Sequence, residues 1–437
     1  MEEPTIEVIE EPTVSELFKL NIERFIDEIS ALDETLPLQM VMLDFKHKNI
    51  IEKLESISES IKEVEEDGEE YLKYKVASDK YIEFSKVNKR IKRLSLAEKI
   101  LPRNHIVSLV NQYDAYLGEL VRILFTVNSN LIRSSQKEIQ VEDLFKFDSL
   151  DEIKMQILDK EIDSILREEH LEQLKILERK ISKLKGKAFT LTTNLPILKD
   201  FIELTQRRNL FVHTNGFTSR QYSANKVKFK FDSECSGEIN FELKAPREYC
   251  KKAFETLFEM SAKLTHVLWR AFAPEEREEA DKNLNTLIYN LLQEKRIPLA
   301  VTMSEFATTE LNKYSSEQVR KFLVINKAIA YKMSGDEQEC SVILKDEDWT
   351  IGTEFKLAKS VLEKDYKTAA TIVEKIGDED EVFNRTAYRE FPLFFKFRET
   401  VEFKESYKNV FKEEFALEGM QKKKEIIETK ASSSEEE

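Results

Sequence analysis

Residues 102–132 read PRNHIVSLVNQYDAYLGELVRILFTVNSNLI, and this stretch has the spacing of a core helix. Its apolar side chains recur every three or four positions and form a stripe wide enough for burial: Ile106, Leu109, Val110, Tyr113, Leu117, Leu120, Val121 and Leu124. A helix with so broad an apolar face needs helical neighbours to cover it. The stretch therefore predicts a helical domain built around it.

The composition of the chain also favours long helices. Only 9 Gly and 9 Pro interrupt 437 residues, which argues against a turn-rich all-β fold and against a doubly wound α/β fold. Hydrophobic residues make up 41% and charged residues 35%, enough for a full core beneath solvated helix faces. We expect a mainly α protein with two or three domains.

Changes in composition and pattern divide the chain into five parts. We expect an acidic disordered N-terminus, an N-terminal helical region, a helical domain, a domain of C-terminal helical hairpins and a charged disordered tail, over 1–13, 14–100, 101–273, 274–416 and 417–437.

One segment of the helical domain departs from the helical period. Val227, Phe229 and Phe231 alternate with lysines, and further along Phe241 and Leu243 alternate with polar residues. Alternation with a period of two is typical of a strand with one buried face. It predicts a small β-hairpin insertion at 226–243.

The chemically most informative run is QRRNLFVHTNG, residues 206–216. It closes an amphipathic pattern that begins near Pro196, and its Asn-Gly ending is a helix stop signal. Arg208 offers a planar guanidinium that matches phosphate oxygens, and His213 offers an imidazole that titrates near neutral pH. Asn209 shares a helix face with His213, four residues away, so we expect its amide to orient the imidazole.

Arg208 and His213 do not converge within one regular helix. They are five residues apart, which is roughly 140° around the axis. Either the terminal turn is distorted, or two copies of the helix face each other across a two-fold axis. The second arrangement suits RNA cleavage without a metal, which needs a base for the 2′-hydroxyl, an acid for the leaving oxygen and a cation for the charge on phosphorus. We therefore expect a homodimer.

The run Arg208-Asn209-Leu210-Phe211-Val212-His213 resembles the motif of the HEPN superfamily (higher eukaryotes and prokaryotes nucleotide-binding domains), in which an Arg and a polar residue precede three variable residues and a His. The resemblance covers roughly residues 100–273. Many members are metal-independent endoribonucleases that build their site at a homodimer interface, often in bacterial toxins and antiviral systems. It implies a HEPN-like helical bundle with Arg208 and His213 as the catalytic pair and Asn209 beside them.

RNA binding has to overcome a net charge of -15 through local positive surfaces. Arg207 and Arg220, on either side of the motif, are the expected RNA-binding residues. A further candidate is residues 71–93, where eight Lys and Arg are interleaved with aromatic residues that can stack on bases. The simpler interpretation of 71–93 is an amphipathic helix with a solvated basic face.

Sequence motifs for common cofactor and metal sites are absent. The chain has no phosphate loop, no dinucleotide-binding glycines and no HExxH pair, so we expect neither a cofactor nor a metal. Its three cysteines form no CxxC pair. The acidic N-terminus does not resemble a signal peptide, and no apolar run approaches about 18 residues. These patterns predict a cytoplasmic protein without a membrane segment.

A competing hypothesis assigns no catalysis to the chain. In it, the protein is a helical scaffold or a nucleotide-binding HEPN-like protein, and the hairpins at 274–416 recruit a protein partner.

Overall fold

The computed structural model describes residues 12–64, 70–133, 147–380 and 382–416. The chain divides into two compact units, 1–274 and 275–437. Helices dominate both, and one antiparallel hairpin is the only sheet in the described ranges. The fold class is therefore mainly α with a small β-hairpin, as predicted. The disorder expected at 1–13 and 417–437 concerns residues that lie outside the description, apart from Pro12 and Thr13.

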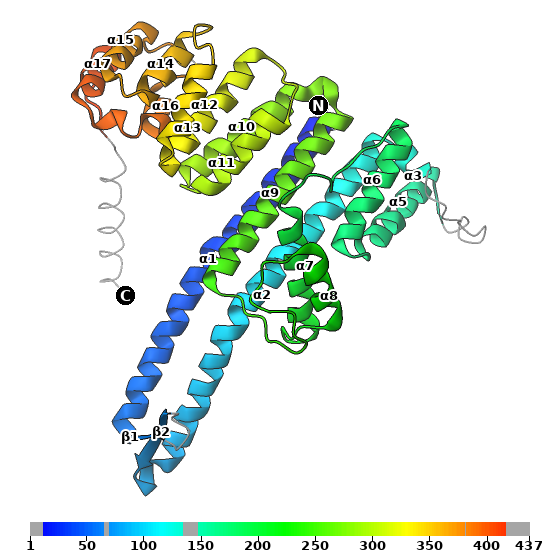
Figure 1. The fold of residues 1–437 in the computed structure, drawn as a ribbon, viewed down its shortest axis with the longest axis vertical. Helices are drawn as coiled ribbons and strands as arrows, with labels where there is room; N and C mark the ends of the chain where they lie inside the picture. Colours follow the sequence, from blue (N-terminus) through cyan, green and yellow to red (C-terminus); the bar gives the residue numbers. More distant parts are fainter. Residues whose placement is uncertain (1–11, 65–69, 134–146, 381, 417–437) are drawn as a thin grey trace, which may run out of the picture. The chain divides into compact units, whose positions relative to one another are not determined.

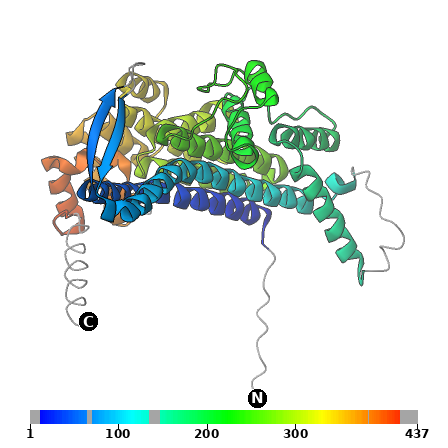
Figure 2. The ribbon, with the colours of Figure 1, turned by 90° about the horizontal axis from the view of Figure 1, so that it is seen from below.

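Three long helices form the core of the first unit: α1 (Val14–Ile57), α2 (Tyr81–Val127) and α9 (Arg247–Phe272) lie side by side (Figures 1 and 2). All of the stripe residues predicted in 102–132 are buried in α2. Near the start of α1, the Trp269 ring stacks on Phe18 at 5.7 Å and its indole N–H donates to Ser15 Oγ at 3.0 Å. These contacts fix the end of α9 against the beginning of α1.

Beyond the start of α9, α1 and α2 continue as an antiparallel two-helix arm, residues 34–64 and 70–102 (Figure 1). Its small core consists of Ile50, Leu54 and Val87, with partly buried side chains around them. The Lys53 ammonium pairs with Glu83 at 2.8 Å, and His47 contacts Glu98. The arm is therefore held together by a modest apolar seam and a few ion pairs.

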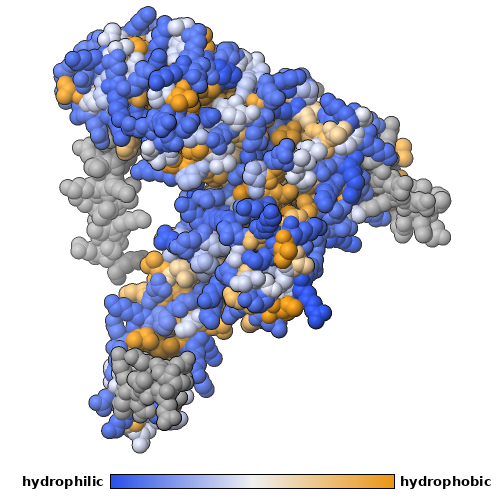
Figure 3. All heavy atoms as spheres, viewed as in Figure 1, coloured by the Kyte–Doolittle hydropathy of each residue, from blue (hydrophilic) through white to orange (hydrophobic). Residues whose placement is uncertain are grey.

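One face of the arm is apolar but uncovered within the described chain. On α1, Leu38, Val41, Met42 and Phe45 recur at helical spacing and are 67%, 65%, 62% and 65% exposed. Figure 3 shows hydrophobic side chains along this part of the molecule. This part of α1 thus exposes an apolar stripe in addition to the residues that pack on α2.

The β-hairpin lies at the tip of the arm and not at 226–243. Strands β1 (Ser58–Val64) and β2 (Glu70–Val76) pair antiparallel, with Ser58 opposite Val76. The helical region expected over 14–100 is interrupted after Ile57, because pairing with another strand overrides the local period. The available signal was Asp67-Gly68, a dipeptide common in hairpin turns, in the sequence between the two strands.

The segment predicted as a hairpin instead begins as a helix, α8 (Arg220–Phe229). The Ser219 hydroxyl caps it by accepting from the Tyr222 N–H at 3.2 Å, and the buried Tyr222 ring anchors it. Lys230 adopts a left-handed φ of 56° and ends the helix. Residues 230–246 follow without strands, apart from one isolated bridge between Phe217 and Glu242. The apolar residues that alternate with polar ones there, such as Phe231 and Leu243, are buried one by one and do not form the face of a strand.

The boundary expected between residues 100 and 101 is also wrong, because it falls inside α2. Helix α2 is 47 residues long and runs through Pro102. A proline in a helix interior costs about 3 kcal/mol or more through one lost hydrogen bond and a clash, and the packing of so long a helix outweighs this. Helix α1 also contains a proline, Pro37. It lies near the level of Pro102, because Asp33, one turn before Pro37, interacts electrostatically with His105, one turn after Pro102.

The remaining helices of the first unit pack around α2. They are α3 (Asn130–Arg133), α5 (Leu150–Leu166), α6 (His170–Lys185) and α7 (Leu198–His213), with α8 beside α7. A short 3₁₀ turn, η1 (Ser78–Lys80), precedes α2. Helix α7 contacts both α2 and α9 and carries the predicted motif.

The second unit consists of short helices packed in succession. They are α10 (Arg277–Gln293), α11 (Ile297–Glu305), α12 (Glu317–Ser334), α13 (Glu337–Asp346), α14 (Thr353–Leu362), α15 (Tyr366–Ile376), α16 (Arg385–Glu390) and α17 (Val401–Phe411). A π-turn at Phe306–Glu310 and 3₁₀ turns at Pro274–Glu276, Pro392–Phe394 and Phe397–Glu399 complete the elements. In the part of the chain that the structure describes, no helix combines the length and apolar character needed to cross a bilayer.

The buried histidine of α9 makes the stability of the first unit depend on pH. His266 is fully buried, its ring stacks on Trp269 at 5.9 Å, and the Arg270 guanidinium donates to its Nδ1 at 3.0 Å. Burial, and then the charge of Arg270, hold the pKa of His266 well below 6.5. The folded imidazole is therefore neutral at pH values where an unfolded one binds a proton.

We expect the free energy of unfolding to fall as the pH drops below about 6.5, by at most about 1.4 kcal/mol per pH unit from this group. Replacing His266→Gln removes the titrating group and should flatten this part of the profile. Urea unfolding from about pH 7 to about pH 5 measures both. Parallel profiles for the two proteins would contradict the assignment.

Candidate functional site: the end of helix α7

Helix α7 buries one face and ends where the sequence predicted. Phe201, Leu204 and Leu210 are buried, and the Thr214 N–H still donates to the Leu210 carbonyl at 2.9 Å, so the helix is regular through His213. The terminal turn is therefore not distorted. A distorted terminal turn therefore does not bring Arg208 and His213 together within one chain.

The Asn-Gly stop has a steric basis. Asn215 and Gly216 adopt left-handed φ values of 53° and 88°. A Cβ on Gly216 would lie 3.1 Å from the Phe211 ring and 3.2 Å from the Leu243 carbonyl, so the position needs glycine. From α2, Arg103 donates to the Asn215 carbonyl at 2.9 Å and fixes the turn.

Arg208 is held in a clamp formed by Asn111, Asp114 and Asn209. Its Nη2 donates to Asn111 Oδ1 at 2.7 Å and to Asp114 Oδ2 at 3.3 Å, and its Nη1 donates to Asn209 Oδ1 at 2.9 Å. The side chain remains 22% exposed. The guanidinium is thus fixed in one orientation while one part of it reaches solvent.

A second histidine contacts the clamp through Asp114. His170, the first residue of α6, is 9% exposed, and its Nε2 lies 2.8 Å from Asp114 Oδ1. Asp114 therefore joins Arg208 and His170. The three residues come from different helices and lie up to 94 residues apart in the sequence.

His213 and Asn209 do not form the predicted contact. His213 is the last residue of α7, is exposed, and makes no hydrogen bond or ion pair with any described residue. Asn209 is half-buried, and its carbonyl oxygen accepts from Arg208 instead. The expectation that Asn209 orients His213 is therefore wrong within one chain, because the Asn209 side chain is turned toward Arg208.

Arg207 is not at the surface, so the expectation that it binds RNA is wrong. It is 0% exposed; its Nε donates to Glu203 at 2.7 Å, its Nη1 to the Lys244 carbonyl at 2.7 Å and its Nη2 to Glu234 at 2.8 Å. Its guanidinium also lies 4.0 Å from the centre of the Tyr249 ring. Arg207 thus ties α7 to residues 230–246 and to α9.

The charges around Arg207 support one another. Burial alone would lower the pKa of Arg207, but Tyr249, Glu203 and Glu234 together raise it above its ordinary value. The pKa of Glu234 is lowered: burial opposes this, and the hydrogen bonds and charge of Arg207 prevail. Glu203 in turn accepts from the hydroxyls of Tyr222 and Tyr249 at 2.7 and 2.6 Å. This cluster, Arg207 with Glu203 and Glu234, is structural.

Arg220 is the first residue of α8 and is exposed. It makes no hydrogen bond or ion pair with the described residues, so its guanidinium is accessible to a ligand. Its role in RNA binding stays a prediction.

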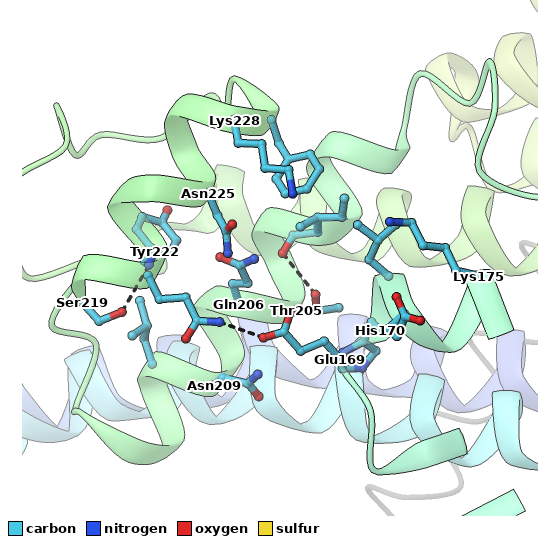
Figure 4. Close-up of a pocket in the computed structure, with 16 residues that line it drawn as sticks. Glu169, His170, Lys175, Thr205, Gln206, Asn209, Ser219, Tyr222, Asn225 and Lys228 are labelled. Atoms are coloured by element: carbon cyan, nitrogen blue, oxygen red, sulfur yellow. Dashed lines mark hydrogen bonds between the residues drawn. The ribbon is translucent and has the colours of Figure 1, made fainter. Parts of the chain in front are cut away.

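Next to the clamp is a pocket that the sequence did not predict. It lies between α6, α7 and α8, has a volume of about 300 Å³, and shares His170 and Asn209 with the clamp (Figure 4). Gln206, Asn225, Lys175 and Lys228 are among the residues that line it. A search of the described residues finds no group of three or more His, Cys, Asp or Glu side chains able to hold a metal ion.

Comparison of the chain with protein-family models, with curated proteins and with solved structures finds no match in any of the three.

The contrast between the two adjacent arginines is testable. Replacing Arg207→Ala leaves Glu203 and Glu234 without their buried cation, and breaking a buried ion pair costs about 3–5 kcal/mol. Replacing Arg208→Ala removes a partly exposed ion pair worth about 1 kcal/mol or less. Urea unfolding measures both free energies; equal losses in the two variants would contradict the structural assignment of Arg207.

Proposed function

We propose that the protein is a metal-independent endoribonuclease that acts as a homodimer, with Arg208 and His213 of both chains around one phosphodiester. The observation that carries the proposal is that a fixed, partly exposed guanidinium and an exposed imidazole both lie in the last turns of one regular helix. Two such helix ends across a two-fold axis would supply two cations and two proton-transfer groups. The resemblance of the motif to the HEPN superfamily supports the same assignment and suggests a role in phage defence or as a toxin.

The clamp leaves Arg208 able to bind phosphate. Its three acceptors use three of the five guanidinium N–H groups. Two N–H groups remain: the one on Nε is buried, and the one on Nη1 is left for a phosphate oxygen. The fixed orientation reduces the entropy that binding would cost. The carboxylate of Asp114 acts through Arg208 as a positioning group.

The reaction needs only proton transfers. One His213 imidazole takes the proton of a 2′-hydroxyl, whose oxygen attacks the adjacent phosphorus. The bond from phosphorus to the 5′-oxygen breaks, and the second His213, in its protonated form, gives that oxygen a proton. Arg208 stabilises the charge that develops on the phosphate oxygens. The products are a 2′,3′-cyclic phosphate and a 5′-hydroxyl.

One run of the chain has the excess of positive charge that RNA binding would need. Residues 73–93 carry eight Lys and Arg and only two acids, and they include the end of β2 and the beginning of α2, whereas the sequence of the rest of the hairpin, 58–72, is acidic. Lys86, Lys89 and Arg90 are exposed there. Together with Arg220, they would hold the phosphates of a bound strand.

A non-catalytic role has one observation in its favour. The hydrogen bonds of Arg208 are also those expected of a purely structural arginine, since all three acceptors belong to the same chain. In that case, the first unit would be a scaffold, and the helices of the second unit would recruit a protein partner.

RNA cleavage in the presence of EDTA separates the two functions. Wild-type protein should cleave total cellular RNA, whereas Arg208→Ala and His213→Ala should each lose about 100-fold or more of the rate. Arg247→Ala, which removes an exposed arginine of the same unit, is the matched control and should keep the wild-type rate. Cleavage that is equal in all variants, or no cleavage by wild type, would leave the scaffold as the better account.

Subunit composition tests the shared site. Wild-type protein should sediment as a dimer, and an excess of His213→Ala chains that exchange with wild-type chains should lower the wild-type activity, since a mixed dimer holds only one of the two histidines that the reaction uses. Full activity from a protein that remains monomeric would contradict the two-fold arrangement.

A further inference from the structure

The pocket between α6, α7 and α8 has its carboxylates and hydroxyls already occupied. Glu169 accepts from Gln221 at 2.8 Å, and Glu172 pairs with Arg179 at 2.7 Å. The hydroxyls of Thr205, Ser219 and Tyr222 bond to Ile202, to the N–H of Tyr222 and to Glu203. These groups shape the walls and have little capacity left for a ligand.

The amides and ammonium groups of the pocket are not occupied in this way. Gln206 and Asn225 make no hydrogen bond with any described residue, and the NH₂ of Asn209 donates none, since only its oxygen is used. Figure 4 shows the amides of Gln206 and Asn225 lying toward each other in the middle of the pocket, with Asn209 below them. An array of this kind presents both donors and acceptors to one ligand.

Two lysines lie at the rim of the same pocket. Lys175 of α6 and Lys228 of α8 are exposed, and neither forms an ion pair with the described residues. The Lys228 ammonium lies 4.9 Å from the centre of the Phe229 ring, which also lines the pocket. Cations at the edge, amides in the centre and an aromatic ring on the wall suit a ligand with an anionic group, a polar edge and a flat ring.

We propose that this pocket binds a single nucleotide, with its base edge on Gln206 and Asn225 and its phosphate toward Lys175 and Lys228. A volume of about 300 Å³ is at the small end of the range for such ligands. Amide side chains read the donor and acceptor pattern of an unpaired base, and lysines bind phosphate as point charges. Asn209 joins the pocket to the Arg208 clamp, so the nucleotide would be the one next to the scissile phosphate; this last step rests on the proposed nuclease function.

Binding of nucleoside 5′-monophosphates tests the pocket apart from catalysis. Isothermal titration of the full chain with each of the four should give saturable 1:1 binding for at least one. Gln206→Leu and Lys175→Ala should weaken that binding by about 10-fold or more, whereas Lys187→Ala, an exposed lysine outside the pocket, should not. His213→Ala should bind as wild type does. Unfolding profiles that match wild type establish that the variants are folded.

Two results would overturn the site: no saturable binding of any of the four, or the same affinity in Gln206→Leu and Lys175→Ala as in wild type. The source of the nucleotide is decided by mapping cleaved positions in RNA. If the wild type prefers a base and Gln206→Leu loses this preference, the bound nucleotide belongs to the RNA substrate. If the preference is unchanged, that assignment is overturned and the ligand is a free mononucleotide. If nucleotides bind but wild type cleaves nothing, the nuclease function fails and the pocket stands.

Discussion

The buried guanidinium of Arg207 is the interaction on which the candidate site depends. Two later segments meet α7 on it: the irregular segment 230–246 through Glu234 and the Lys244 carbonyl, and α9 through Tyr249, while Glu203 of α7 itself completes the set. A charge this deep is tolerated only because carboxylates and a carbonyl satisfy it from several sides. Tyr222 of α8 joins the same cluster through Glu203. The wall that α8 contributes to the pocket is therefore positioned by an ion pair inside the first unit.

Adjacent arginines consequently have opposite environments. Successive residues of a helix point about 100° apart, so Arg207 is directed into the interior while Arg208 reaches the edge of α2 and solvent. Asp114 holds Arg208 on one oxygen and contacts His170 on the other. Helix α7 thus supplies both a buried arginine that stabilises the fold and a partly accessible one. Because the helix is regular through His213, the two arginines stay on different sides of it.

The sequence was sufficient where local rules decide the structure. The apolar stripe of α2, the extent of α7 and its Asn-Gly end follow from periodicity and from the conformational freedom of glycine. The sequence was insufficient where residues far apart in the chain decide the structure. Arg207 has the same local pattern as a surface arginine, and partners such as Glu234, 27 residues away, are what allow it to be buried. The hairpin was placed at the wrong alternation because Val227, 77% exposed, and Phe229 belong to a capped helix. His170 and the pocket depend on how three helices meet, which no single segment encodes.

The two prolines at the base of the arm affect how the arm can move. Pro37 and Pro102 each remove one backbone hydrogen bond, at nearby levels of two neighbouring helices. Bending there meets less resistance than elsewhere along the pair, because no intact ladder has to break. The hairpin is about 20 residues, or about 30 Å, from this pivot, so a bend of about 10° would displace it by about 5 Å. Small flexing at the base thus becomes a larger displacement of the hairpin at the other end of the arm.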